Sequence, residues 1–174
     1  MFAVMYLKQM GVQNVYAVTA SKHQHREELA VKFGADKVFC LSEQGEEAVF
    51  DVIKKSNNGL GVDLCFEASG APKAVVQGMD ILRNRGVYLV PGQYSASGGI
   101  EIQPQIITFK ALHIIGSSQY SMSDVKAYLE FFKIHPELYS TIESATDKYP
   151  ISKINDAFED MKNNKNIKTL LIKG

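Results

Sequence analysis

The amino-acid sequence predicts an α/β protein built on a doubly wound parallel sheet. Three observations indicate this class: strand-like and helix-like patterns alternate along the chain, the connections are short, and most strands are continuous apolar runs. Such runs are typical of strands covered on both faces, as in a parallel sheet with helices on each side. The strands predicted on this basis are residues 15–19, 37–41, 62–68, 86–92 and 112–116.

Helices separate these predicted strands. Each has apolar residues at helical spacing and a residue that stops or opens a helix, such as a glycine just past the end or a proline in the first turn. They are residues 26–33, closed by Gly34, residues 46–55, closed by the Asn-Asn-Gly at 57–59, and a helix that opens at 69–72 and runs through Leu82.

The last third of the chain repeats the alternation more loosely. We expect its apolar stripes to pack in the core, as such stripes usually do. The predicted elements are a helix with the stripe Val125, Tyr128, Leu129 and Phe132, an extended segment at 142–149, a helix with the stripe Ile151, Ile154, Ala157, Phe158 and Met161, and a strand at 167–172.

The beginning of the chain departs from this order. Val4, Met5, Leu7 and Met10 predict a helix that starts at residue 1 or 2 without a capping side chain. A doubly wound domain normally opens with a strand rather than a helix, so we expect an element to be missing before this helix. Unpaired sheet edges would follow, with dimerisation, strand exchange or poor solubility.

Composition excludes several classes of function. The chain has 174 residues, and 19 Lys and Arg balance 19 Asp and Glu. Zero formal net charge without a long basic run argues against nucleic acid as a partner. No apolar stretch approaches the roughly 20 residues of a membrane span, and the start does not resemble a signal peptide. Cys40 and Cys65 lie in apolar runs, so we expect two buried thiols and a cytoplasmic protein.

Candidate ligand-binding residues follow the predicted strands. In an open parallel sheet, ligands bind at the carboxyl ends of the strands, and glycines there let a flat ligand approach the backbone closely. The segments that follow the strands are residues 20–22, 69–70, 91–93 and 116–118. The last three contain glycine, and this shared pattern predicts a nucleotide crevice.

The segment after the first predicted strand bears on the kind of nucleotide. Sites for NAD usually carry Asp or Glu here to bind the ribose hydroxyls, but residues 19–26 contain no acid. Ser21 followed by Lys22 and Arg26 suits the 2′-phosphate of NADP, because a hydroxyl donates a hydrogen bond and the cations supply charge. The alternative is a solvated surface loop.

Conventional catalytic motifs do not occur in the sequence. There is no zinc-ligand spacing, no GxSxG, no GxxxxGK[ST] and no GxGxxG. His113 lies in an apolar strand, so we expect it in the core rather than in a catalytic role. Lys168, beside the start of the last strand, is either a functional cation or a surface lysine.

Several segments, taken together and in order, match the pattern of a known family. They are the Gly-Val-Gln-Asn-Val-Tyr-Ala-Val at 11–18, the Phe-Gly-Ala-Asp at 33–36, the Gly-Val-Asp-Leu-Cys-Phe-Glu-Ala-Ser-Gly at 61–70, the Gly-Val-Tyr-Leu-Val-Pro-Gly at 86–92, and the Ile-Ser-Lys-Ile-Asn-Asp-Ala-Phe at 151–158. Together they resemble the zinc-type medium-chain alcohol dehydrogenase family over nearly the whole chain. The set is specific, although each segment alone is weak.

The resemblance implies a role for each matching position. Ser21 would select the adenosine ribose or its 2′-phosphate, with Lys22 and Arg26 nearby, and Lys168 would lie near the pyrophosphate. The remaining positions line the rest of the crevice: Ser69 and Gly70 on its adenosine side, Pro91, Gly92 and Gln93 along the nicotinamide, and Ser117, Ser118 and Gln119 at its carboxamide.

The resemblance also implies what the whole protein does. Residues 1–143 would be an NAD(P)-binding Rossmann-like domain without its first strand and glycine-rich turn, and residues 144–174 a C-terminal segment of the catalytic domain. The family transfers hydride between a nicotinamide cofactor and an alcohol or carbonyl compound, with zinc expected only in the part of the catalytic domain that is missing here. This chain alone should therefore be inactive, with no catalytic and no metal residue of its own.

Two other functions fit the same residues. A zinc-free quinone or enone reductase belongs to the same superfamily, and zinc content would distinguish it. A non-catalytic nucleotide-binding module is the other alternative. In each case we expect the partners to be small molecules rather than nucleic acid or membrane, and we expect a homo-oligomer.

Overall fold

The computed structural model describes residues 1–93 and 98–174, which form two compact units. We call residues 1–43 together with 122–174 the terminal unit, and residues 44–121 the middle unit. Every strand pair among the described residues is parallel, and helices alternate with strands. The predicted α/β class with parallel sheets is thus confirmed. No helix in the described residues is long and apolar enough to cross a membrane.

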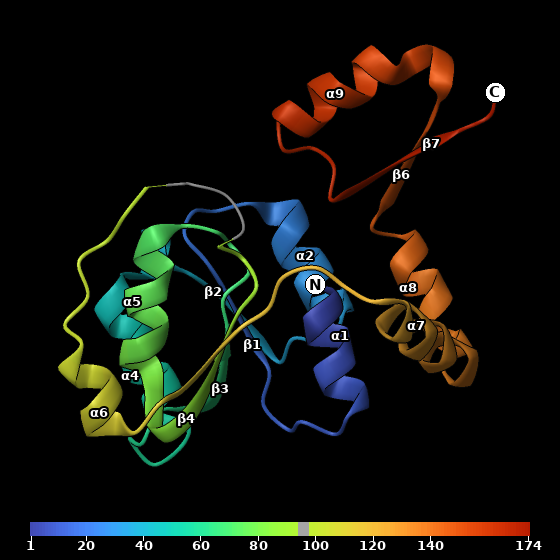
Figure 1. The fold of residues 1–174 in the computed structure, drawn as a ribbon. Helices are drawn as coiled ribbons and strands as arrows, with labels where there is room; N and C mark the ends of the chain where they lie inside the picture. The colour runs from blue at the N-terminus through green and yellow to red at the C-terminus, as the bar shows by residue number, and fades with distance from the viewer. Residues whose placement is uncertain (94–97) are drawn as a thin grey trace. The chain divides into compact units, whose positions relative to one another are not determined.

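The middle unit is a three-stranded parallel sheet with helices packed against it. Its strand order is β3-β4-β5, and α5 contacts both β3 and β4 (Figure 1). Its helix α4 also contacts α5, in agreement with their neighbouring positions in the figure. The elements are α4 (Glu46–Lys55), β3 (Val62–Phe66), α5 (Pro72–Ile81), β4 (Leu82–Val90), α6 (Gln105–Lys110) and β5 (His113–Gly116).

A tyrosine fills the centre of the middle unit. Tyr88 on β4 is fully buried with Met79 and Leu82, and its hydroxyl donates a hydrogen bond to the carbonyl of Ala74 at 2.9 Å. A Cβ at Gly78 would lie 2.3 Å from that hydroxyl oxygen. Glycine lowers helix stability, so its place inside α5 follows from the space that the tyrosine needs.

The terminal unit contains two separate parallel strand pairs, β1 with β2 and β6 with β7. Met5, Leu29, Phe33, Phe132 and Leu138 form its buried cluster. The elements are α1 (Phe2–Gln9), β1 (Tyr16–Thr19), α2 (Gln24–Lys32), β2 (Lys37–Cys40), α3 (Leu41–Gln44, which ends at the boundary with the middle unit), α7 (Met122–Ile134), the 3₁₀ turn η1 (Pro136–Leu138), α8 (Tyr139–Glu143), β6 (Thr146–Pro150), the 3₁₀ turn η2 (Ile151–Lys153), α9 (Ile154–Lys162) and β7 (Lys168–Ile172).

Every strand except β4 has a single partner within the described residues. β1 pairs only with β2, and β3 pairs only with β4. The other edge of each of these strands therefore presents backbone groups without a ladder partner among the described residues.

Some predicted element boundaries were wrong. β4 begins at Leu82 rather than at residue 86, because Leu82 pairs with Val62 before the register shifts towards Leu64. The extended segment predicted at 142–149 begins as the end of α8, and its strand covers Thr146–Pro150. The short helices α3 and α6 were not predicted. The left-handed residue that follows α6 is an alanine, so no glycine marks its end.

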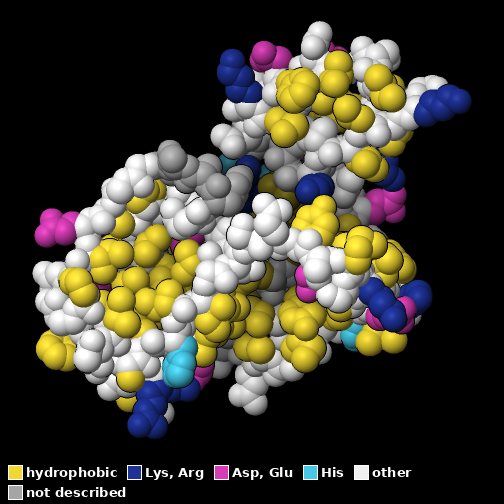
Figure 2. All heavy atoms as spheres, viewed as in Figure 1, with side chains coloured by type: hydrophobic (Ala, Val, Ile, Leu, Met, Phe, Trp, Pro, Cys, Tyr) yellow, Lys and Arg dark blue, Asp and Glu magenta, His cyan; other side chains and the backbone are white. Residues whose placement is uncertain are grey.

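The expectation of core packing was also wrong for several apolar residues. Ala157 is buried in α9, but Phe158 and Met161 are exposed, and Figure 2 shows hydrophobic side chains gathered over this helix. In α7 only Phe132 of the predicted stripe is buried. All of β5 is exposed, so His113 does not lie in the core. Periodicity identifies the apolar face of an element and does not say what covers it.

Candidate functional site

Eight of the predicted site residues lie at one edge of the middle unit's sheet. Ser69 and Gly70 follow β3, residues 91–93 follow β4, and residues 117–119 follow β5. The three strands are parallel neighbours, so their carboxyl ends meet at the same edge. Ser117, Ser118 and Gln119 are exposed there, and Gln119 has a left-handed backbone with φ of 63°.

A buried carboxylate connects two of these loops. Glu67, directly after β3, is only 4% exposed. Its Oε1 accepts hydrogen bonds from the Ser69 amide and hydroxyl, both at 2.6 Å, and from the Gly70 amide at 2.9 Å. Its Oε2 accepts a bond from Gln93 Nε2 at 3.3 Å. Burial of a charged group is costly without such partners, and here it is well supplied with donors.

The two glycines are required where the loops approach each other. Gly70 has φ of 72°, and a Cβ there would lie 2.8 Å from the Gly92 carbonyl oxygen. A Cβ at Gly92 would lie 2.3 Å from Glu67 Oε2. The Gly92 amide also donates to the Glu67 carbonyl at 3.0 Å. Both glycines thus let the loops after β3 and β4 pack closely against each other.

Glu67 lies in one of the matching segments of the sequence, but the sequence does not predict that its carboxylate holds two loops together. An acid that ends an apolar strand and is followed by Ser-Gly was the available signal. Burial, together with the charge of Glu67, raises the pKa of the nearby Cys65 thiol to about 12. Because its pKa is raised, the half-buried Cys65 thiol stays protonated and unreactive at neutral pH. Cys40 is buried, and neither cysteine forms a disulfide.

The loop after β1 is built differently. Ser21 and Lys22 are exposed, and the loop is tied to the start of α3 by a hydrogen bond from the Ser42 amide to the Ala20 carbonyl at 3.1 Å. Lys22 Nζ lies 2.6 Å from Glu43 Oε1. The hydrogen bond and charge of Glu43 raise the pKa of Lys22. Glu43 in α3, which directly follows β2, thus places a carboxylate beside this loop.

Arg26 and Lys168, 142 positions apart, line one hollow of about 430 Å³ in the terminal unit. Arg26 Nη2 is 3.4 Å from Asn164 Oδ1, and His23 Nε2 is 2.8 Å from the Asn164 carbonyl oxygen. Arg26 Nε is buried without a hydrogen-bond partner among the described residues. The hollow is therefore lined by two cationic side chains, Arg26 and Lys168, and such a pair is suited to an anion. Ser21 and Lys22 do not line this hollow.

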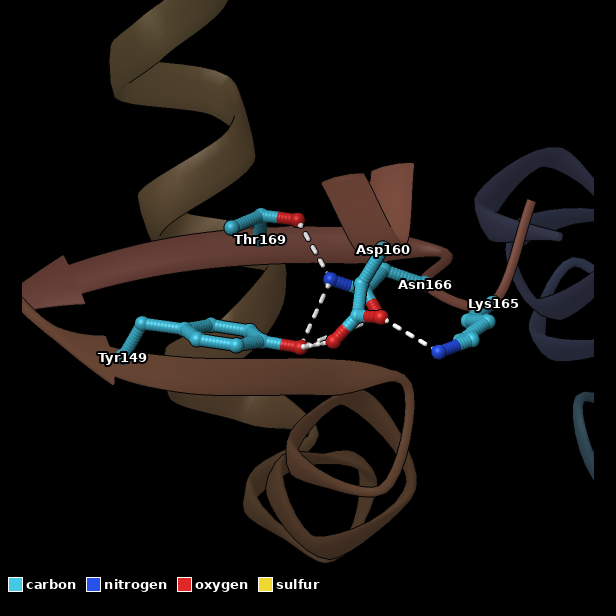
Figure 3. Close-up of polar contacts among 5 residues, drawn as sticks. All are labelled: Tyr149, Asp160, Lys165, Asn166 and Thr169. Carbon is cyan, nitrogen blue, oxygen red and sulfur yellow. Dashed lines mark hydrogen bonds and ion pairs between the residues drawn. The ribbon is translucent and has the colours of Figure 1, made fainter. Parts of the chain in front are cut away.

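A polar network fixes the segment that carries Lys168. Figure 3 shows the Tyr149 hydroxyl between Asp160 and Asn166: it donates to Asp160 Oδ2 at 2.8 Å and accepts from Asn166 Nδ2 at 3.2 Å. Asn166 also donates to Thr169 Oγ1 at 3.1 Å, and Lys165 pairs with Asp160 at 2.7 Å. The network joins β6, α9 and β7, and so holds the loop before Lys168 in place.

Three comparisons with known proteins bear on this arrangement. A family model described as zinc-binding dehydrogenase matches residues 1–133. The chain belongs to the zinc-binding dehydrogenase family. The predicted resemblance to zinc-type alcohol dehydrogenases is therefore confirmed.

Relatives of this zinc-binding dehydrogenase chain act on polyols and related alcohols, as their names state. It is 26% identical over 151 residues to D-arabitol-phosphate dehydrogenase of Enterococcus avium, covering 87% of this chain and 41% of that protein. It is 28% identical over 151 residues to sorbitol dehydrogenase of Halalkalibacterium halodurans, covering 87% and 42%. The chain thus spans less than half the length of these relatives.

Solved structures share the fold. An alcohol dehydrogenase from Thermotoga maritima superposes with a TM-score of 0.89 at 23% identity, covering 99% of this chain and 47% of that one. The 2R,3R-butanediol dehydrogenase of Bacillus subtilis gives a TM-score of 0.79 at 24% identity, covering 98% and 47%. The fold of this family member is therefore that of the corresponding part of those enzymes.

Proposed function

We propose that this chain is the cofactor-binding part of an NAD(P)-dependent zinc-type alcohol or polyol dehydrogenase. The observation that carries the proposal is the buried Glu67 carboxylate, which holds two glycine-bearing loops together at one sheet edge in a member of this family. Nicotinamide cofactors supply the hydride chemistry themselves, and the protein binds and orients them.

In this proposal the middle unit binds the flat parts of the cofactor. Ser69 and Gly70 line its adenosine side, whereas Pro91, Gly92 and Gln93 lie along the nicotinamide. The support is the position of these loops at the carboxyl ends of neighbouring parallel strands, where ligands of open parallel sheets bind. Ser117, Ser118 and Gln119 are exposed at the same edge and would offer backbone groups to the carboxamide.

The candidate residues of the terminal unit suit the charged parts of a cofactor. Arg26 and Lys168 would hold phosphate oxygens, and the two cations that line one hollow support an anion there. Ser21 and Lys22 favour NADP over NAD, because a hydroxyl and a cation suit a 2′-phosphate.

The remaining expectations belong to the same proposal. Residues 1–143 would form the cofactor domain and residues 144–174 a part of the catalytic domain. The names of the relatives support an alcohol or polyol as the substrate. The unpaired edges of β1 and β3 favour a homo-oligomer, and the two thiols are compatible with a cytoplasmic location.

No step of the proposed function passes through a metal held by the described part of this chain. Among residues 1–93 and 98–174, no three His, Cys, Asp or Glu side chains are grouped as a metal site would require. The residues of this chain would bind and orient the cofactor.

Titration of the 174-residue chain with NADH and NADPH, followed by cofactor fluorescence and calorimetry, tests the proposal. We expect saturable binding of at least one cofactor and no turnover with a panel of alcohols and polyols. Failure of both cofactors to bind would overturn the cofactor-binding role. Turnover at the rate of an ordinary dehydrogenase would show that the chain is more than the cofactor part.

A further inference from the structure

The ion pair between Lys22 and Glu43 joins the ends of two adjacent strands. The Thr19 end of β1 pairs in register with the Cys40 end of β2, so the residues that follow them emerge side by side. Glu43 Oε1 lies 2.6 Å from Lys22 Nζ, and the two side chains are 46% and 60% exposed. Lys22, the proposed partner of a 2′-phosphate, is thus already paired with the carboxylate of Glu43.

Other charges around Lys22 do not replace this partner. The Glu27 carboxylate acts on Lys22 only at longer range, because its Oε1 accepts a bond from the His23 amide at 3.0 Å at the start of α2. Glu43 makes the largest contribution to the raised pKa of Lys22, so the ammonium group is fully protonated at neutral pH. Lys22 is therefore positively charged at neutral pH. The Glu43 carboxylate and a 2′-phosphate would compete for this charge.

We propose that Glu43 is a specificity-determining residue, which limits the preference of this chain for NADP by competing with the 2′-phosphate for Lys22. The inference rests on the proposed cofactor-binding function. A phosphate dianion that reaches Lys22 must displace the Glu43 carboxylate and then tolerate a negative charge beside it. The ribose 2′-hydroxyl of NAD meets neither obstacle, and it can donate a hydrogen bond to the carboxylate.

The exposure of the pair makes this competition possible. A solvent-exposed ion pair is weak and readily exchanged, since water screens both charges. The pair therefore leaves NADP able to bind, with reduced affinity, rather than excluding it. Removal of the carboxylate should release Lys22 for the phosphate.

The test compares NADPH and NADH affinities of the 174-residue chain by fluorescence titration at one fixed ionic strength. The Glu43→Gln variant should bind NADPH about fivefold more tightly, with NADH affinity changed by less than about twofold. Glu47→Gln is the matched control, because it removes an equally exposed charge from α4 and should leave the ratio unchanged.

A double-mutant cycle distinguishes competition from a general charge effect. The gain in NADPH affinity should disappear when Glu43→Gln is made in a Lys22→Gln background. An unchanged ratio in Glu43→Gln, or an equal gain without Lys22, would overturn the inference and leave the cofactor-binding proposal intact. Absence of binding of both cofactors to the unmodified chain would overturn both.

Discussion

The strand ends of the two units hold their candidate site residues by different means. In the middle unit, the loops after β3 and β4 are tied by a carboxylate that is 4% exposed and accepts three bonds from Ser69 and Gly70. In the terminal unit, the loop after β1 is tied to α3 by a backbone bond and by an ion pair between exposed side chains.

The difference separates two tasks. A buried, fully bonded carboxylate fixes backbone positions, so changes there should affect stability and the binding of both cofactors together. An exposed pair contributes little to stability but presents charge to whatever binds. Changes there should alter which cofactor is preferred. Substitutions in the middle unit and in the terminal unit should therefore have different effects.

The largest effect is expected for Glu67→Ala. The substitution leaves the amides of Ser69 and Gly70 without their acceptor, and an unmet buried donor costs about 1–3 kcal/mol. We expect a loss of about 3 kcal/mol in the free energy of unfolding, measured by urea denaturation, and at least tenfold weaker binding of both cofactors.

Glu67→Gln is the matched control for this prediction. Its side-chain oxygen can still accept at the Oε1 position, so it should lose less than half as much stability. Equal losses in the two variants would show that the charge, rather than the hydrogen bonds, holds the loops.

A slightly smaller effect is expected for Gly92→Ala. The new Cβ would lie 2.3 Å from Glu67 Oε2 and 2.9 Å from the Gly70 amide nitrogen, so the two loops must separate. We expect about 1–3 kcal/mol of destabilisation, typical of overpacking, and weaker binding of NADH and NADPH to the same degree. Gly99→Ala is the control, because nothing lies within 4 Å of its Cβ position. A shift in the NADH to NADPH ratio would break the contrast between the units.

A still smaller, pH-dependent effect is expected at Asp36 in the terminal unit. The Val15 amide donates to its Oδ2 at 2.7 Å and Lys8 Nζ pairs with it at 3.0 Å, which together lower the pKa of Asp36. A lowered carboxyl pKa adds stability that is present above the ordinary value and is lost as pH falls through the native one. Asp36→Asn should cost about 1 kcal/mol at pH 7, a modest amount because the carboxylate is 38% exposed.

Thermal unfolding at pH 7 and at pH 3 checks this prediction. A loss of about 1 kcal/mol corresponds to roughly 2–4 °C in a chain of this length. The variant and the unmodified protein should differ at pH 7, and the difference should be smaller at pH 3, which lies below the ordinary aspartate pKa. A difference of the same size at pH 3 would show that the Asp36 charge is not responsible.

The sequence predicts local structure better than it predicts partners. The limits of α4 and the class of the fold follow from periodicity, and the glycines at the strand ends can be identified from the sequence alone. The exposed apolar face of α9 was not foreseen, because periodicity cannot identify what covers a helix. The clash that requires Gly78 depends on Tyr88, ten positions away on a different element.

The candidate site shows the same limit. Ser21, Lys22 and the glycines could be selected from their positions after strands, since that rule is local. Glu43 was not selected, because its closeness to Lys22 depends on the pairing of β1 with β2. The contact between Glu67 and Gln93 likewise depends on the pairing of β3 with β4.

The central claim is that the loops after the strands bind a nicotinamide cofactor. The most direct measurement is amide hydrogen exchange of the 174-residue chain with and without saturating NADPH. The account predicts slower exchange in peptides covering residues 67–71, 91–93 and 20–26, and unchanged exchange in α4 (Glu46–Lys55). Protection confined to other segments, or none at saturating cofactor, would contradict it.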